Sequence, residues 1–367
     1  MRIIKNRTLE LDRVPVLDFE IHDRACLIGR SRYCDWKLPD PERALSSVHC
    51  FIQYHEDEYY LIDNSLNGVF ITKSGQEIGK GRGKLILDGD IFTIGDYEIT
   101  AVLDGPSLPR DPSTVFPDVP PEAWDPYRSI ALTPEGKWHP DWRGHLIRAT
   151  NGEGPTILVD AGMGDVVNEH TGQSGKLLEN LAALGVQPED IDIVVTTHCH
   201  GDHIGWNVTY EGDTPKLTFP NATHWIAERD WEHYSKPENE NPAFDKSVKP
   251  LKELGALKLI PGVETLAPGI STLPTNGHTP GHQCILVESG GTTAVITGDL
   301  FHSVAQVTEQ AWCPTFDWNT AMSTQSRKGI LMLAATQDWI VFTGHLATGS
   351  SIGNVVSEGG KSVWKPL

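Results

Sequence analysis

Four residues of the kinds that bind metals stand together near the middle of this chain. His198, His200, Asp202 and His203 lie within six positions, directly after the apolar run 191–197, which predicts a buried strand. Imidazole and carboxylate are the usual ligands of zinc and similar metals. A turn that leaves a strand can point alternate side chains into one cavity, so His198 and His200 could bind one metal while Asp202 and His203 bind a second.

Three further residues of this kind occur beside predicted strands later in the chain. His278 stands in Gly277-His-Thr-Pro-Gly-His282, Asp299 follows the run 293–297, and His345 follows the run 339–342. Sites of layered α/β folds gather at the ends of strands. His282 in the same segment is a second candidate, so the residues alone leave His278 and His282 open beside His198, His200, Asp202, His203, Asp299 and His345. Cys199 is predicted to be a core residue, because strand alternation should point it away from the metals.

The residues around this cluster alternate between strand and helix patterns. The runs 156–160 and 282–287 predict strands, whereas 175–185 and 327–335 predict helices. This mixture predicts an α/β domain. The chain before it reads differently: short apolar runs recur between turn signals such as Asn67-Gly68 and predict an all-β sandwich.

A proline-rich stretch separates the two patterns, and we read residues 104–121 as a semi-rigid linker. The predicted organisation is a β domain at 1–103, the linker at 104–121, and the α/β domain at 122–367.

Composition narrows the class of protein. The 367 residues carry a net charge of −19, which argues against nucleic acid as the main partner because phosphates are repelled. No apolar run is long enough for a membrane span, and the start has no apolar signal stretch. The six cysteines form no CxxC pair, so a disulfide framework is not expected. We expect a soluble cytoplasmic protein without nucleic-acid or membrane partners.

The histidine cluster resembles the HxHxDH motif of the metallo-β-lactamase fold hydrolases. His198, His200, Asp202 and His203 match that motif, while the later ligands of the family match His278, Asp299 and His345. The resemblance thus implies these seven metal ligands, and His282 is predicted to be a structural turn residue. The resemblance covers roughly residues 125–367 and implies an αββα sandwich with a two-metal site. Zinc is the expected metal, with iron or manganese as alternatives. Asp160 matches a supporting aspartate of the family.

Such a site would make this chain a hydrolase. Two metals lower the pKa of a bridging water, and the resulting hydroxide attacks the substrate. Asp299 would bridge the metals, and Asp202 is both a ligand and the expected catalytic proton shuttle.

The resemblance also suggests the substrate, because an aspartate at 299 counts against β-lactams. The segment from Gly298 to Arg327 looks like the lactonase and methyl-parathion-hydrolase-like branch, although Ser303 stands where that branch often has a histidine. We expect a lactone or other ester as the small-molecule substrate, with an organophosphate or phosphodiester as the alternative. The candidate aromatic wall of the pocket is Trp206, Phe301, Trp312 and Phe316, for which simple core packing is an equal reading.

The first hundred residues resemble a forkhead-associated (FHA) domain, a β-sandwich that binds phosphothreonine peptides. The ordered motifs are Gly29-Arg30-Ser31, Ser46-Ser47-Val48-His49 and Asn64-Ser65-Leu66-Asn67-Gly68. Arg30 and Ser46 match the phosphate contacts of the family, and Asn67 matches its peptide contact. Ser47 and Leu66 depart from the family pattern. An arginine fork and a hydroxyl suit a phosphate dianion.

Two hypotheses from different classes follow. One is a metallohydrolase whose FHA module serves recruitment or regulation, with a phosphothreonine protein as partner. The other is a phosphothreonine-dependent binding or signalling protein with an inactive hydrolase domain. The complete set of predicted ligands favours the first hypothesis, since a relic would be expected to lose at least one ligand.

Overall fold

The structure is a computed structural model. It describes the strands 26–29, 36–37, 50–55, 58–63, 83–85 and 91–94, and then residues 96–165, 174–347 and 350–367. The chain divides into two compact units, Met1–Phe92 and Thr93–Leu367, which are considered separately.

The first unit contains a five-stranded sheet with the order β2-β1-β3-β4-β5. Its strands are β1 (Cys26–Gly29), β2 (Trp36–Lys37), β3 (Cys50–His55), β4 (Glu58–Asp63) and β5 (Gly83–Leu85). β1 pairs parallel to β2 and antiparallel to β3, and β3, β4 and β5 continue antiparallel. The described part of this unit is thus built from strands, and a complete β-sandwich remains a prediction.

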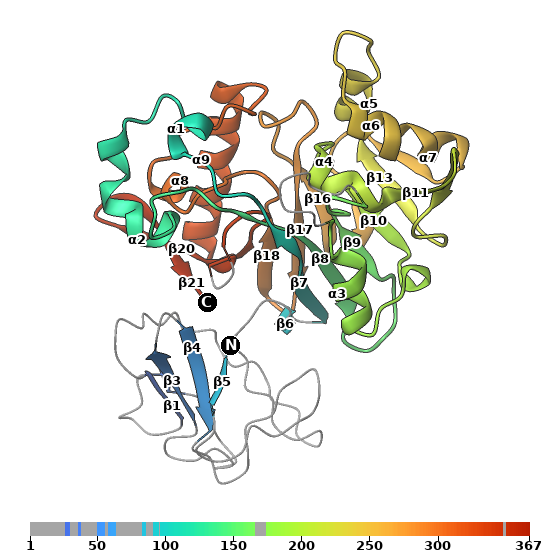
Figure 1. The fold of residues 1–367 in the computed structure, drawn as a ribbon. Helices are drawn as coiled ribbons and strands as arrows, with labels where there is room; N and C mark the ends of the chain where they lie inside the picture. The colour runs from blue at the N-terminus through green and yellow to red at the C-terminus, as the bar shows by residue number, and fades with distance from the viewer. Residues whose placement is uncertain are drawn as a thin grey trace. The chain divides into compact units, whose positions relative to one another are not determined.

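The second unit contains two seven-stranded sheets, which lie between outer helices (Figure 1). The first sheet has the order β14-β13-β10-β9-β8-β7-β6. Its members are β6 (Ile91–Ile94), β7 (Tyr97–Pro106), β8 (Asp141–Ala149), β9 (Ile157–Val159), β10 (Ile193–Val195), β13 (Thr223–Ala227) and β14 (Leu257–Ile260). β9, β10, β13 and β14 run parallel, which brings their carboxyl ends to one edge.

The second sheet runs in chain order from β15 to β21. Its members are β15 (Thr265–Ala267), β16 (Ile270–Pro274), β17 (Gln283–Ser289), β18 (Thr292–Ile296), β19 (Ile340–Phe342), β20 (Ile352–Glu358) and β21 (Lys361–Pro366). Only the β18–β19 pair is parallel, so these two strands also end at one edge. A small antiparallel pair, β11 (Val208–Glu211) with β12 (Thr214–Leu217), lies apart from both sheets.

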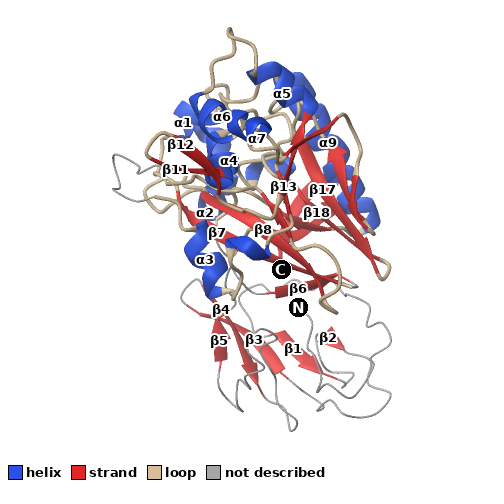
Figure 2. Cartoon of the chain, turned by 90° about the vertical axis from the view of Figure 1, so that its right-hand side faces the viewer, coloured by secondary structure: helices blue, strands red, loops and turns tan. Residues whose placement is uncertain are grey.

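Helices cover the outer faces of both sheets. They are α1 (Pro112–Val115), α2 (Arg128–Ala131), α3 (Leu177–Ala183), α4 (Gly201–Ile204), α5 (Glu228–Tyr234), α6 (Pro242–Ser247), α7 (Lys249–Glu253), α8 (Ala305–Thr308) and α9 (Thr320–Gln337), with three short 3₁₀ turns η1 (Pro121–Tyr127), η2 (Pro188–Asp190) and η3 (Gly205–Asn207). α3 packs on β7 and α5 on β13 and β14, whereas α9 packs on β20 and β21. Figure 2 shows α3 and α9 on opposite sides of the strands. This layering agrees with the predicted αββα sandwich. Within the described residues no helix is long and apolar enough to cross a bilayer.

The proline-rich segment 104–121 differs from the expected linker. β7 extends to Pro106 and pairs with β8, and Pro112 begins α1 behind the N-cap Asp111. Val115, Phe116 and Val119 are buried in an aromatic cluster with Trp124 and Trp138. Proline is compatible with the end of a strand and the first turn of a helix, so the apolar residues between the prolines decide the outcome. The two functional domains at 1–103 and 122–367 remain a prediction.

Candidate metal centre

The structure brings all seven predicted metal ligands to one place between the two sheets. His198 and His200 follow β10, Asp202 and His203 begin α4, His278 lies between β16 and β17, Asp299 follows β18, and His345 follows β19. These loops leave the strands at the edges described above, as expected for a site on a layered α/β fold.

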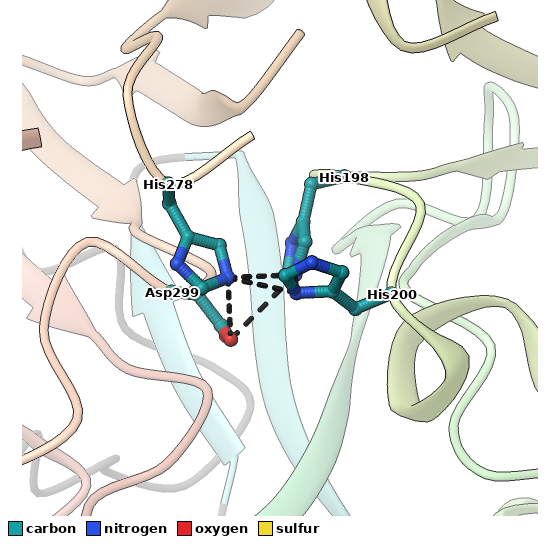
Figure 3. A group of neighbouring side chains, drawn as sticks. All are labelled: His198, His200, His278 and Asp299. Atoms are coloured by element: carbon teal, nitrogen blue, oxygen red, sulfur yellow. Dashed lines mark hydrogen bonds and ion pairs between the residues drawn. The ribbon is translucent and has the colours of Figure 1, made fainter. Parts of the chain in front are cut away.

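The ligand atoms form two groups that share one carboxylate. The first, here called the three-histidine group, comprises His198, His200 and His278. One nitrogen of each of these histidines points to a common centre (Figure 3). His278 Nε2 lies 3.2 Å from His198 Nε2 and 3.0 Å from His200 Nδ1, and His198 Nε2 lies 3.1 Å from His200 Nδ1. Asp299 Oδ2 completes this group, 3.3 Å from His278 Nε2.

The second, here called the aspartate–histidine group, comprises Asp202, His203 and His345. Asp202 Oδ2 lies 3.7 Å from His203 Nε2 and 3.4 Å from His345 Nε2. Asp299 Oδ1 faces the same two nitrogens at 3.0 and 2.9 Å. Asp299 therefore presents one oxygen to each group, which is the arrangement of a bridging ligand.

The outer nitrogens of these histidines determine which way their lone pairs point. His203 Nδ1 donates to Asp160 Oδ2 (2.8 Å), His278 Nδ1 to Asp317 Oδ1 (2.8 Å), and His345 Nδ1 to the Asp141 carbonyl (2.9 Å). A neutral imidazole that donates through Nδ1 holds an unprotonated Nε2. Three Nε2 atoms are thus aimed into the cluster, each with a lone pair when its imidazole is neutral, and outer hydrogen bonds of this kind are typical of metal-binding histidines.

The pKa values of the cluster residues are also shifted. Burial raises the pKa of Asp299, but the charges of His203 and His345 outweigh it and hold this pKa well below its ordinary value. Asp299 Oδ1 is buried, and the polar atoms that face it are the Nε2 atoms of His203 and His345. Burial lowers the pKa of His278, but hydrogen bonds and charge from Asp299 and Asp317 raise it to about 9. Burial lowers the pKa of His200 to about 3, which keeps that imidazole neutral.

The cluster attracts positive charge and offers unprotonated nitrogen and carboxylate oxygen, which fits divalent metal ions of the zinc type. Asp202 differs from the other carboxylate because its side chain is 23% exposed, so it reaches both the cluster and solvent.

Two residues that were not expected to be ligands have structural positions. His282 Nε2 accepts the backbone N–H of Asp299 at 3.1 Å, and its Nδ1 faces the Thr275 hydroxyl at 2.9 Å. Cys199 is buried in an apolar cluster with Ile204 and Phe244. Both predictions are confirmed.

Of the four residues of the candidate aromatic wall, Phe316 lies beside the cluster. The ring of Phe316 lies 4.7 Å from that of His302 and 6.0 Å from that of His278. The other three pack elsewhere: Phe301 against Trp364, Trp312 against Trp124 and Tyr127, and Trp206 beside the core under α3. Their aromatic rings made them candidates for a pocket wall, but they pack against other aromatic and apolar side chains.

His302 also lies in the cluster, although it was not among the predicted ligands. Its Nε2 lies 3.0 Å from Asp299 Oδ2, and its ring stacks on that of His345 at 5.3 Å. Asp299, His302 and His345 could themselves hold a cation. The sequence contained a clue to this residue: the related branch often has a histidine where this chain has Ser303, and His302 stands one position earlier.

The predicted phosphopeptide contacts Arg30, Ser46 and Asn67, and the neighbouring Ser47, His49 and Leu66, lie outside the described residues.

Comparison with known proteins agrees with this geometry. The family model of the metallo-beta-lactamase superfamily matches residues 145–345, and that of the FHA domain matches residues 26–95. An N-acyl homoserine lactonase of Bacillus cereus is 30% identical over 211 residues, which are 53% of this chain and 77% of the relative.

Two solved structures share the fold. The dizinc quorum-quenching lactonase AidC, in complex with a product, matches with a TM-score of 0.66 at 22% identity, over 77% of this chain and 98% of its own. The hydrolase AbOPH of the beta lactamase superfamily matches with a TM-score of 0.64 at 25% identity, over 76% and 96%. The chain therefore belongs to the metallo-β-lactamase superfamily, as a metal-dependent hydrolase that carries an FHA domain ahead of its hydrolase domain.

Proposed function

We propose that this protein is a dinuclear metallohydrolase that opens a lactone or cleaves another ester. The observation that carries the proposal is the division of the ligand atoms into two groups joined by Asp299. The substrate class is supported by the relatives named N-acyl homoserine lactonase, of whose length the chain spans 77%.

In this proposal the three-histidine group holds one metal and the aspartate–histidine group the other, with zinc as the expected ion. Two metals held together supply an activated water and polarise the carbonyl of the substrate. Asp299 would hold both metals, one through each of its two oxygens. Phe316, half-buried beside His278 and His302, provides an apolar surface against which the organic part of the substrate can lie.

Asp202 is the proposed proton carrier. Burial raises its pKa, but the charges of His203 and His345 outweigh this and lower it, so the carboxylate is ionised and can accept a proton. In ester cleavage the attacking water loses a proton, and the leaving alkoxide needs one. Asp202 can take the first proton and deliver it to the alcohol oxygen, which balances the reaction.

The test combines metal content with substrate preference. Protein purified without chelator should hold two metals per chain and hydrolyse an acyl lactone or aryl ester faster than a phosphotriester or a β-lactam. Faster turnover of the phosphotriester would favour the organophosphate alternative. Absence of metal and of turnover, persisting after zinc, manganese or iron is added, would support the binding protein with an inactive hydrolase domain.

For the FHA domain we propose a β-sandwich that binds a phosphothreonine protein through Arg30, Ser46 and Asn67, and so recruits or regulates the hydrolase. The match of the FHA family model to residues 26–95 supports this. The full chain should bind phosphothreonine peptides from a library but not their unphosphorylated forms, and Arg30→Ala should remove the difference. Equal binding of both forms would contradict a phosphate-dependent role.

A further inference from the structure

Asp230 is a fully buried carboxylate that lies outside the ligand set. It stands in the first turn of α5, directly after β13, and its side chain is closed to solvent. A buried carboxylate is costly unless several donors satisfy it, so its partners show what it stabilises.

Its hydrogen bonds connect the two loops that carry the three-histidine group. Asp230 Oδ2 accepts the N–H of Cys199 at 2.9 Å and the hydroxyl of Thr279 at 2.9 Å, while Oδ1 accepts the N–H of Gly281 at 2.5 Å. Cys199 stands between His198 and His200, and Thr279 directly follows His278. One side chain thus connects the peptide between His198 and His200 with the segment that follows His278.

The surroundings of Asp230 are shaped for this contact. A Cβ at position 281 would lie 2.6 Å from the Asp230 nitrogen, so only glycine allows the approach. The peptide of Cys199 is held on its other side as well, because Asn241 Nδ2 donates to the Cys199 carbonyl at 2.9 Å. The loop between His198 and His200 is therefore fixed through its backbone from both sides.

The aspartate–histidine group is held by different partners. His203 donates to Asp160 and His345 donates to the Asp141 carbonyl. None of the hydrogen bonds of Asp230 reaches this group.

We propose that Asp230 is a positioning residue that sets the spacing of the three-histidine group, so that its loss weakens the binding of one metal and spares the other. This rests on the proposed function, because it requires two metals to bind. Loss of outer-shell partners typically weakens metal affinity 10–100-fold.

The central variant is Asp230→Asn, which keeps the size of the side chain but turns an amide donor toward one of the three N–H or O–H donors. The matched control is Glu232→Gln on the same helix, an exposed residue with the same change of charge. Metal-free protein is titrated with Zn²⁺ against a competing chelator, and Co²⁺ absorption spectra report which group is filled. His278→Ala and His345→Ala provide reference spectra for loss of each group.

We expect Asp230→Asn to bind one metal about 10–100-fold more weakly, with a spectrum like that of His278→Ala, and the second metal within about twofold of the wild type. Equal weakening of both metals, or no weakening, would overturn the proposal. Failure of the wild-type protein to bind metal would instead count against the proposed function.

A milder pair of variants decides the matter if Asp230→Asn does not fold. Thr279→Val removes one hydrogen bond to Asp230 and should weaken the same metal by roughly 2–10-fold, the usual net effect of one hydrogen bond. Thr279→Ser keeps the hydroxyl and should bind as the wild type does. Identical affinities for the valine and serine variants would contradict the role of Asp230.

Discussion

The two halves of the metal cluster hold their histidines in different ways. In the three-histidine group Asp230 connects the peptide between His198 and His200 with the segment that follows His278, and His278 alone also donates to a carboxylate, that of Asp317. The inner atoms of this group are all imidazole nitrogens except Asp299 Oδ2. In the aspartate–histidine group the imidazoles donate directly to Asp160 and to the Asp141 carbonyl, and two carboxylates face them. The second half is thus richer in oxygen ligands and in negative charge, although Asp299 belongs to both.

One continuous cluster can therefore offer two metal positions that differ in their ligand atoms. Nitrogen-rich sets suit zinc, whereas carboxylate-rich sets also suit manganese. Removing the shared Asp299 tests whether the two halves depend on each other. Changing one half at a time tests whether they bind different metals.

The largest effect is expected when the shared carboxylate is removed. Asp299→Ala should lower kcat/KM for the best ester or lactone by roughly 10³-fold or more, since several kcal/mol of transition-state stabilisation depend on the metals. Metal analysis should show weakened binding in both halves. Glu288→Ala, on exposed surface of β17, is the control. Loss of only one metal would mean that the halves are independent.

The next effect concerns the support of His278 from α9. Arg327 is fully buried, lies 3.6 Å from Asp317 Oδ2 through its terminal nitrogen, and donates to the Leu300 carbonyl through Nε at 2.8 Å. Arg327→Met should lower the free energy of unfolding by about 3–5 kcal/mol, because buried Asp317 loses the positive charge beside it and the carbonyls of Leu300, Gln310 and Trp312 lose a donor.

Denaturant unfolding measures this change, and Lys328→Met, exposed at the next position, should stay within about 0.5 kcal/mol of the wild type. A loss for Arg327→Met no larger than that of the control would show that α9 does not support the three-histidine half.

A metal competition sharpens the comparison directly. Metal-free protein given one equivalent of Zn²⁺ and a large excess of Mn²⁺ should place the zinc in the three-histidine group and manganese in the aspartate–histidine group, because of the second carboxylate. Electron paramagnetic resonance of bound Mn²⁺ checks this, and Asp202→Asn should reduce the manganese signal more than the zinc content. Equal distribution of both metals over both halves would contradict the inferred inequality.

The smallest effect is expected for His224, a buried histidine outside the cluster. Its pKa shows what burial does to an imidazole that has no carboxylate beside it. Burial lowers the pKa of His224 to about 4, and both of its ring nitrogens lack a described partner. The unfolded chain then binds more protons than the folded chain between about pH 4 and 6.5. Stability falls as pH falls through that window, by at most about 1.4 kcal/mol per pH unit.

His224→Phe should flatten this part of the stability profile, as measured by denaturant unfolding from pH 4 to 7. The exposed Asn221→Ala is a control for substitution near β13. An unchanged slope in His224→Phe would show that burial of this histidine does not couple stability to pH.

The local parts of the site were predictable because their signals are short in sequence. Strand β10 and the ligands from His198 to His203 form one run, in which strand periodicity ends where the histidines begin. The helix at 175–185 and the strands around 156–160 and 282–287 appear as α3, β9 and β17 for the same reason. The sharing of Asp299 between two groups followed only from the family resemblance.

The partners that fix the site were decided by tertiary structure alone. Asp230 is 31 positions from Cys199 and 51 from Gly281, and a short periodic pattern contains no information on which carboxylate meets those N–H groups. The linker prediction failed at Phe116 for a related reason: proline composition describes the backbone, whereas burial of that ring depends on Trp124 and Trp138 folding over it. The residue types and their spacing were enough to predict which side chains could bind metal. How each of these side chains is held depends on the packing of the two sheets, because a buried charge forms hydrogen bonds only with groups that the fold brings close to it.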